Sequence, residues 1–326
     1  MTATPHVLVT GAAGFIGRHT VAALHHAGHR VTAVDVRPNP GHLADAARWL
    51  RADFTTAALL AQISSGHYTA VVHQAGISDT RAPAGPELDE VNTSGPLRLA
   101  DACRAGGTRL IYASSHAVYG TLHHREPIAE GADSDPRRCS GPLNPYARSK
   151  LVLDQQMRAR HATGLDWIGL RYTNVFGPDE TDKGPMASIL TQLLRQAAGT
   201  GTIRLFDDSL TAARDYIPVE EVSATLVQLA ATVPRLPGAV HNLGAGRAVS
   251  FAEVTQWCSR LHREATGRPL RIELAPNPVA AAYQYFTCAD MTALGTLLPH
   301  RSTTSTDSVK ARAAELFRTF RDRPTG

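Results

Sequence analysis

A tyrosine and a lysine four residues apart carry the clearest chemistry in this sequence. Tyr146 and Lys150 follow Pro145, which suits the first turn of a helix, so both side chains are expected on one helix face. A phenol with an ordinary pKa of about 10 is a poor base at neutral pH. A neighbouring ammonium stabilises the phenolate and lowers that pKa, which makes the pair a usable acid/base. Ser115, after an apolar run at residues 109–113, is placed to hold a substrate hydroxyl beside the pair.

Lysine is rare in this chain, which makes its positions informative. The 326 residues include 3 lysines and 30 arginines. Arginine stays charged at any accessible pH, whereas a lysine can be tuned and can give up a proton. Lys150 and Lys183 both occur where such an ammonium would matter. Lys310 falls in a polar C-terminal segment with no partner motif, and we assign it no function.

Three glycines spaced G-x-x-G-x-x-G indicate a dinucleotide site. They follow an apolar, β-rich run at residues 6–10 and open a predicted helix that ends near Ala27. The glycines allow a tight turn, let backbone N–H groups approach a pyrophosphate and let the helix pack on the strand. A second predicted strand at residues 30–34 ends at Asp35, where a carboxylate can bind an adenosine ribose. The glycines are Gly11, Gly14 and Gly17.

The phosphate state of the cofactor stays open on these residues. Asp35 favours NAD slightly, because a carboxylate repels a 2′-phosphate. Arg37, two residues further on, favours NADP. With either cofactor, Ser115, Tyr146 and Lys150 would remove an alcohol proton while a hydride leaves carbon for the nicotinamide ring.

Strands and helices alternate along the first half of the chain. Residues 70–74, 109–113 and 167–171 are expected to form buried strands, and a helix carrying Asn92 lies between the first two. The sequence therefore predicts an α/β fold with a doubly wound parallel (Rossmann) sheet and a smaller α/β C-terminal substrate domain. After about Gly177 the pattern becomes irregular, with a return to helix near residues 219–232 and short strands around 239–243. The predicted cofactor domain covers residues 1–176 and a returning segment at about 215–240, and the rest of residues 177–326 forms the sugar-nucleotide domain.

Composition narrows the class of protein. Hydrophobic residues make up 43% and charged residues 19%, as in an ordinary globular protein. The start of the chain lacks the basic and apolar pattern of a signal peptide, and no apolar run approaches membrane-spanning length, so we expect a cytoplasmic protein without a membrane partner. The net charge of +4 comes from dispersed arginines, so nucleic acid is not an expected partner. The four scattered cysteines are expected to be free thiols, and neither cysteines nor histidines have the spacing of a metal site.

Three further stretches match a known family. Residues 112–120 (YASSHAVYG), 144–150 (NPYARSK) and 171–178 (RYTNVFGP) match the pattern of the extended short-chain dehydrogenase/reductases, which include nucleotide-sugar epimerases and dehydratases. Within that group, the stretches DKGPMAS, NLGAGRA and YQYFT, at 182–188, 242–248 and 283–287, resemble most closely the ADP-glycero-manno-heptose 6-epimerases. The resemblance spans nearly the whole chain.

The resemblance implies an isomerase that inverts carbon 6 of an ADP-heptose through a transient ketone, with NAD or NADP held by the enzyme. It gives Lys183 the role of a second acid/base, so that Tyr146 serves one epimer and Lys183 the other. It also implies a homo-oligomer. The expected cofactor residues are Gly11, Gly14, Phe15, Ile16, Gly17, Asp35, Arg37, Asp53, Gln74, Ala75, Gly76, Ser78, Asn92, Tyr146, Lys150 and Val175. The expected substrate residues are Ser115, Asn174, Lys183, Gln192, Phe206, Ser209, Arg214 and Tyr283.

Departures from the family pattern leave other activities open. Pro185 and Gln192 replace a serine and a histidine of the family, and Ala213 and Ala282 replace a lysine and an arginine. A UDP-hexose 4-epimerase or a nucleotide-sugar 4-reductase would need Tyr146 but not Lys183. A catalytically silent protein that senses NAD(P) would not need an intact Tyr146 and Lys150. Structural pairing of Lys183 with Asp182 or a phosphate is the alternative to its catalytic role.

Overall fold

The computed structural model describes residues 4–41, 43, 45–162, 164–231, 235–301 and 303–322. The chain forms two compact units. Unit 1 comprises Met1–Val118, Asn144–Tyr172 and Glu220–His241, and unit 2 comprises Tyr119–Leu143, Thr173–Val219 and Asn242–Gly326. Residues 119–143 therefore pack within unit 2, although the sequence analysis placed them in the first domain. The predicted returning segment at about 215–240 overlaps Glu220–His241 of unit 1, and its first residues, 215–219, fall in unit 2.

A seven-stranded sheet is the centre of unit 1. Its strand order is β10-β6-β5-β4-β1-β2-β3, and neighbouring strands from β6 to β3 pair in parallel. The chain reverses its direction of travel across the sheet at β1, which is the switch point where ligands bind in doubly wound folds. This topology confirms the predicted fold class. The strands are β1 (His6–Thr10), β2 (Arg30–Asp35), β3 (Arg48–Arg51), β4 (Ala70–His73), β5 (Arg109–Ser115), β6 (Trp167–Tyr172) and β10 (Ala239–Leu243).

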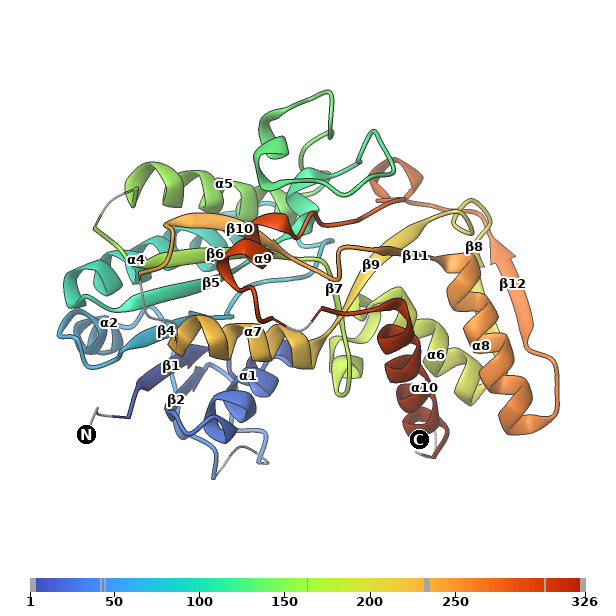
Figure 1. Cartoon of the computed structure of the whole chain (residues 1–326), viewed down its shortest axis with the longest axis horizontal. Coiled ribbons are helices and arrows are strands. Elements are labelled where there is room, and N and C mark those ends of the chain that lie inside the picture. Colours follow the sequence, from blue (N-terminus) through green and yellow to red (C-terminus); the bar gives the residue numbers. More distant parts are fainter. Residues whose placement is uncertain are drawn as a thin grey trace. The chain divides into compact units, whose positions relative to one another are not determined.

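Helices cover both faces of this sheet. Helices α4 and α5 lie on one face, with α2 against α4, and helices α1 and α7 lie on the other (Figure 1). All residues of β1, β4 and β6 are buried, as expected for a parallel sheet between two helix layers. The helices are α1 (Phe15–His26), α2 (Ala57–Ser64), α3 (Pro86–Asp89), α4 (Gly95–Gly106), α5 (Pro145–Arg160) and α7 (Val219–Ala231).

The single helix predicted around Asn92 is interrupted. Helix α3 is followed by a π-helical segment, Glu90–Ser94, before α4 begins. Pro96, in the first turn of α4, has no amide hydrogen to donate back to this segment. The wider turn contains Asn92, whose side chain is fully buried. Such π-helical turns are frequent at functional sites.

Unit 2 is more regular than the sequence suggested. Helices α6 (Ile189–Gly199), α8 (Phe251–Thr266) and α10 (Thr306–Asp322) pack against one another and bury Leu190, Leu193 and Leu194 at helical spacing. The expectation of an irregular pattern after Gly177 was therefore wrong. The other elements are β7 (Asn174–Phe176), β8 (Thr202–Phe206), β9 (Ala213–Pro218), β11 (Ala248–Ser250), β12 (Arg271–Ala275) and α9 (Thr292–Leu297).

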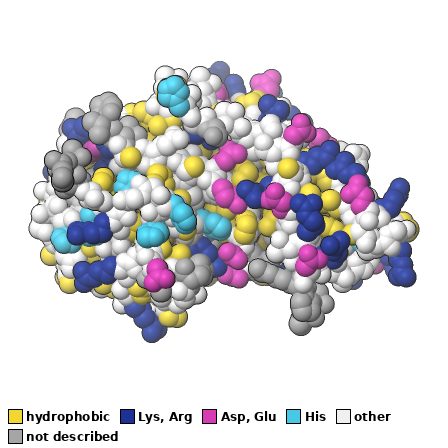
Figure 2. All heavy atoms as spheres, turned by 60° about the horizontal axis from the view of Figure 1, so that its bottom comes forward, with side chains coloured by type: hydrophobic (Ala, Val, Ile, Leu, Met, Phe, Trp, Pro, Cys, Tyr) yellow, Lys and Arg dark blue, Asp and Glu magenta, His cyan; other side chains and the backbone are white. Residues whose placement is uncertain are grey.

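Unit 2 contains two small sheets. In unit 2, β11, β9 and β7 make one sheet and β12 and β8 another. Figure 2 shows basic and acidic side chains intermingled over one face of the molecule. None of the described helices is both long enough and apolar enough to cross a membrane. All four cysteines are buried free thiols, as predicted.

Candidate active site

The glycine turn between β1 and α1 is built around close backbone contacts. Gly11 has φ of +67°, and a Cβ atom at this position would lie 2.5 Å from the backbone nitrogen of Ala75, just after β4. A Cβ at Gly17 would lie 2.0 Å from the carbonyl oxygen of Gly11. The first turn of α1 has no side-chain cap from Gly14, so its amide groups are suited to an anion. The turn fits the pyrophosphate of a dinucleotide.

A buried carboxylate lies next to this turn. Asp35, at the end of β2, accepts hydrogen bonds from the backbone nitrogens of Ala13 and Arg37, each at 2.9 Å. The Arg37 side chain also pairs with it, with Nε 3.2 Å from Oδ1. The Asp35 side chain is 5% exposed and that of Arg37 is 56% exposed, so the carboxylate is the fixed group of the two. This arrangement fits the ribose of NAD.

Asn92 and Gln74 fix the backbone beyond β4. The Asn92 amide accepts from the Ile77 nitrogen at 2.9 Å and donates to the Ile77 carbonyl oxygen at 2.9 Å and to Ser149 Oγ at 3.0 Å. Gln74 Nε2 donates to the Tyr172 hydroxyl at 3.0 Å. The loop that contains Gly76 and Ser78 is thus held between β4 and α5. Asp53 lies before α2 and accepts from the amide and hydroxyl groups of Thr55 at 2.8 and 2.6 Å.

The structure places Ser115 beside Tyr146 in unit 1, and Lys150 lies one helical turn further along α5. Asn144 caps α5 by accepting from the Ala147 nitrogen at 2.9 Å, which starts the helix directly before Tyr146. Ser115 ends β5, and its side chain hydrogen bonds with Tyr146. One strand, β5, and one helix, α5, therefore carry the three predicted catalytic groups.

Burial decides the protonation of this pair. Burial raises the pKa of Tyr146, and the hydrogen bond with Ser115 opposes the rise. The sequence led us to expect that the pKa of Tyr146 would be lowered. The direction is opposite because the cost of desolvating the phenolate outweighs the stabilisation from the Ser115 hydrogen bond. Burial also lowers the pKa of Lys150 to about 8, while the charge of Asp154 opposes the fall. Lys150 is therefore mostly protonated at pH 7 and loses its charge as the pH rises through about 8.

Lys183 lies in unit 2 on a short 3-10 helical segment, Glu180–Met186. Its Nζ is 3.9 Å from Glu180 Oε1, and its side chain is 32% exposed. The fully buried Glu180 also accepts from the hydroxyls of Ser188 and Thr191, at 2.9 and 2.5 Å. Burial raises the pKa of Glu180, and Lys183 opposes the rise. A carboxylate near Lys183 is therefore that of Glu180, which the sequence analysis did not name.

Arg214, on β9, is a buried cation between two aromatic rings. Its guanidinium carbon lies 5.4 Å from the ring centroid of Phe251 and 5.3 Å from that of Tyr283. Burial lowers the pKa of Arg214, and Tyr283 opposes this. Among the described residues, no carboxylate lies within ion-pair distance of this guanidinium. Phe206 meets Tyr283 edge-on at 5.8 Å, so the cation lies in an aromatic cluster suited to a bound anion.

Other predicted substrate residues of unit 2 make local contacts. Gln192 Nε2 donates to the carbonyl oxygens of Pro185 and Ala187, at 3.2 and 2.7 Å, and so holds the end of the Lys183 segment. Ser209 Oγ donates to the Phe206 carbonyl oxygen at 2.8 Å. These bonds give each side chain a structural role, and their contacts with a substrate stay predictions.

Asn174 and Val175, at the start of β7, also make contacts within the protein. Asn174 Nδ2 donates to Thr287 Oγ1 at 3.1 Å and to the Asp215 carbonyl oxygen at 3.3 Å. Val175 is buried and pairs with Ile217 of β9. Both residues contribute to the β7-β9 ladder, and their predicted ligand contacts are untested.

Sequence reasoning missed three buried carboxylates. Asp154 lies four residues after Lys150 and Glu180 three before Lys183, and this spacing was the available signal. Asp215 accepts from the backbone nitrogens of Ala245 and Ala289, at 2.7 and 3.0 Å. Burial raises its pKa to about 6. No sequence spacing would have revealed that last carboxylate, because its partners are far along the chain.

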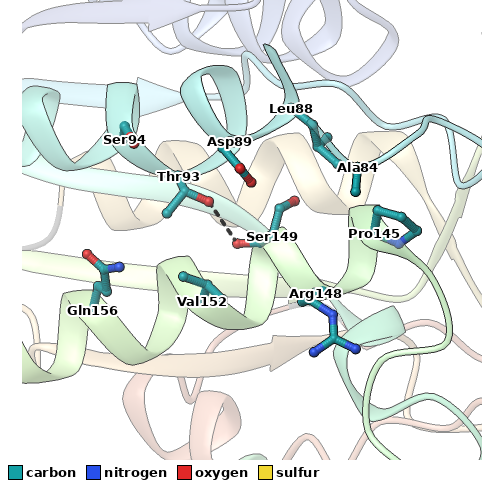
Figure 3. Close-up of a pocket in the computed structure, with 10 residues that line it drawn as sticks. All are labelled: Ala84, Leu88, Asp89, Thr93, Ser94, Pro145, Arg148, Ser149, Val152 and Gln156. Atoms are coloured by element: carbon teal, nitrogen blue, oxygen red, sulfur yellow. Dashed lines mark hydrogen bonds between the residues drawn. The ribbon is translucent and has the colours of Figure 1, made fainter. Parts of the chain in front are cut away.

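A separate cavity lies on the other side of α5. Its volume is about 400 Å³, and α5 contributes Arg148, Val152 and Gln156 to it (Figure 3). The Thr93 hydroxyl donates to the Ser149 carbonyl oxygen at 3.3 Å in its wall. None of the predicted site residues lines this cavity, so it is distinct from the candidate active site.

The chain matches one protein family and resembles many solved structures. Residues 7–244 match the NAD dependent epimerase/dehydratase family. The structure of MoeE5 in complex with UDP-glucose and NAD is similar, with 30% sequence identity, a TM-score of 0.75, and coverage of 96% of this chain and 99% of that one. These findings agree with the resemblance deduced from the sequence.

Two further structures extend the comparison. The Helicobacter pylori ADP-L-glycero-D-manno-heptose-6-epimerase has 25% identity and a TM-score of 0.81, with coverage of 98% of this chain and 97% of that one. The UDP-glucose-4-epimerase of Stenotrophomonas maltophila, with bound NAD and formylated UDP-arabinopyranose, has 26% identity and a TM-score of 0.77. That match covers 97% of this chain and 98% of the other.

Proposed function

Because the chain belongs to the NAD dependent epimerase/dehydratase family, we propose that it is a nucleotide-sugar epimerase that inverts carbon 6 of an ADP-heptose. The observation that carries the finer assignment is Lys183, a partly exposed ammonium beside a buried carboxylate, in a stretch that resembles the heptose epimerases. Bound NAD supplies a hydride acceptor that is regenerated in each turnover. Asp35 and the glycine turn would hold it.

The residues of unit 1 handle the proton of one epimer. Ser115 would orient the hydroxyl on the reacting carbon, and Tyr146 would take its proton as the carbon is oxidised to a ketone. The Lys150 ammonium favours the phenolate form, which burial otherwise disfavours. This group of residues is expected in any reaction of the family, so it does not identify the sugar.

A second acid/base is what an epimerisation adds. The ketone is reduced from its opposite face, so the new hydroxyl points in another direction and needs a different proton donor. Lys183 would supply this proton and, in the reverse direction, remove it. After one turnover Tyr146 has gained a proton and Lys183 has lost one. Exchange of both groups with solvent between turnovers returns them to their starting states, so the protons balance.

Arg214 would hold the part of the substrate that does not react. A diphosphate placed against this buried guanidinium would provide the counter-charge that the described residues do not supply. The rings of Phe206 and Tyr283 offer apolar surface for the nucleoside. A sugar nucleotide is therefore the substrate class that these side chains fit.

A UDP-hexose 4-epimerase is the second candidate. It is supported by the similarity to MoeE5, which was solved with UDP-glucose, and to the UDP-glucose-4-epimerase of Stenotrophomonas maltophila. The replacements at Pro185, Ala213 and Ala282 also weaken the match to the heptose enzymes. This activity would require Tyr146 and not Lys183.

The test is the stereochemistry of the product. Purified protein would be incubated with both epimers of ADP-glycero-manno-heptose and, separately, with UDP-glucose and UDP-glucuronic acid, and the sugars would be analysed by NMR. We expect inversion at carbon 6 of the heptose and none at carbon 4 of the hexoses. Tyr146→Phe serves as the inactive control. Inversion at carbon 4 alone would replace the first candidate by the second.

We also propose a cytoplasmic homo-oligomer, as the sequence analysis expected. Light scattering on the purified protein would give its mass in solution, to be compared with the chain mass of 34.9 kDa. A monomer at all concentrations would contradict this part of the proposal.

A further inference from the structure

Helix α5 and strand β5 are joined at three successive residues of the strand. Lys150 Nζ donates to the Ala113 carbonyl oxygen at 3.1 Å. On either side of Ala113, the Tyr112 hydroxyl and Ser114 Oγ donate to the two carboxylate oxygens of Asp154, at 3.0 and 2.9 Å. One turn of α5 thus fixes both the position of β5 along its own axis and the distance between the strand and the helix.

We propose that Asp154 is the positioning residue of the redox site, holding the end of β5 against α5 so that Ser115 meets Tyr146 and Lys150 keeps its charge. This inference rests on the proposed roles of those three residues. Ser115 directly follows the last strand residue that Asp154 binds, so a shift of the strand would move its hydroxyl. Asp154 itself contacts neither Tyr146 nor Lys183, the two groups to which we assign proton transfer.

Asp154 has the environment that such a role requires. Its side chain is fully buried, and Arg171 Nε donates to Oδ2 at 2.8 Å from an equally buried guanidinium. A buried carboxylate is tolerated only when it is paired and its oxygens are hydrogen bonded. Arg171 on β6 lies opposite Ser114 in the sheet, so the pair also ties β5 to β6.

The sheet leaves room for the Tyr112 contact. Gly169 of β6 is paired with Tyr112, and a Cβ atom at this glycine would lie 2.5 Å from the phenol oxygen. Any other residue at this position would push the ring away from its bond with Asp154. The absence of a side chain at Gly169 thus independently indicates that the phenol's position is constrained.

The charges around Lys150 give Asp154 a second effect. Asp154 raises the pKa of Lys150 against the lowering caused by burial. His73, on β4, is neutral because burial and the Lys150 charge lower its pKa to about 3. Burial raises the pKa values of Tyr146 and Tyr112, and Arg171 is paired with Asp154. Asp154 is therefore the anion that helps to keep the ammonium.

The experiment uses the rarity of lysine. With three lysines in the chain, a protein labelled with ¹³C at lysine Cε gives three NMR signals, which can be assigned with Lys150→Met, Lys183→Met and Lys310→Met. The pKa of Lys150 would be measured by titration in wild type and in Asp154→Asn. We expect Asn to lower it by about one unit, and Asp154→Glu to restore most of the difference.

A matched control removes a different ion pair on the same strand. Arg109, the first residue of β5, pairs with Asp166 at 2.9 Å. Asp166→Asn should lower the melting temperature without moving the Lys150 titration. If Asp154→Asn does not fold, the double variant with Arg171→Gln also removes the buried guanidinium that Asn would leave unpaired, and it should still lower the pKa of Lys150.

Two results would overturn the inference. One is an unchanged Lys150 titration in a folded Asp154 variant, and the other is an equal shift in Asp166→Asn. Because the titration needs no sugar substrate, its failure is separate from a failure of the proposed epimerisation. Once a substrate is in hand, Asp154→Asn should lower kcat more than it changes KM.

Discussion

Lys150 and Lys183 each have a buried carboxylate nearby in sequence, yet different elements hold them. Lys150 is on a 16-residue α-helix, is 4% exposed and donates to a strand carbonyl. Lys183 is on a seven-residue 3-10 segment, its side chain is 32% exposed, and its carboxylate is 3.9 Å away. If the two lysines have the roles that we propose, a lysine that tunes a neighbour is fixed and desolvated, whereas a lysine that exchanges protons is kept near solvent.

The largest effect is expected at the fixed pair. Tyr146→Phe and Lys150→Met should each lower kcat by about 10²–10⁴-fold, because the acid/base and the charge that stabilises its phenolate are lost. Steady-state kinetics would measure this on whichever sugar nucleotide proves active. Unchanged melting temperatures are the control for folding. Near wild-type activity in either variant would remove the distinction between the two lysines.

Lys183→Met should have the next largest effect. We expect a loss of about 10²-fold or more in carbon-6 inversion, with cofactor binding and thermal stability preserved. Product analysis by NMR and NAD titration by calorimetry would measure the two quantities. Activity retained in this variant would favour the 4-epimerase candidate.

The pH dependence of the rate should report the charge of Lys150. The pKa of Lys150 is about 8, and its ammonium is the form that stabilises the phenolate. The limb of the rate profile that depends on Lys150 should therefore fall as the pH rises through about 8, by about tenfold per unit. Arginine stays charged, so Lys150→Arg should lose this falling limb even if little activity remains. The same falling limb in that variant would assign it to another group.

A smaller effect is expected at Glu180. Glu180→Gln keeps a polar group for Ser188 and Thr191 and removes the charge near Lys183. We expect kcat to fall by several-fold, and the free energy of unfolding to change by about 1 kcal/mol. Denaturant unfolding and kinetics would separate the two effects. A change in stability without one in kcat would make Glu180 purely structural.

Lys310 should show no effect. It lies on α10, and Lys310→Met is expected to leave kcat unchanged and the free energy of unfolding within about 0.5 kcal/mol. This variant is the baseline for the other lysine substitutions. A loss of activity here would mean that lysine replacement affects the protein generally.

The sequence predicted the parts of the site that depend on short spacing. The strand, glycine turn and helix around Gly11, and the Tyr146 and Lys150 pair, are local patterns of about ten residues or fewer, and the structure contains both turn and helix. The fold class followed from the alternation of strands and helices. Asp154 could have been suspected from its position one helical turn after Lys150.

Other features depend on contacts between distant segments. The direction of the Tyr146 pKa shift comes from burial, which no local spacing encodes. Residues 119–143 join unit 2 through bridges such as Ile128 with Ala289, more than a hundred residues away. The π-helical turn at Asn92 reflects a proline and a buried amide acting together.

The position of Arg214 has a thermodynamic consequence. If Arg214 binds the nucleotide diphosphate as we propose, it contacts a part of the molecule that both epimers share, so it stabilises substrate and product to the same extent. Such a contact can keep the nucleotide bound while the sugar changes its orientation. It cannot favour one product over the other. As with any catalyst, the final ratio of free epimers depends only on the free energies of the two sugar nucleotides in water, and the same ratio should be reached from either side.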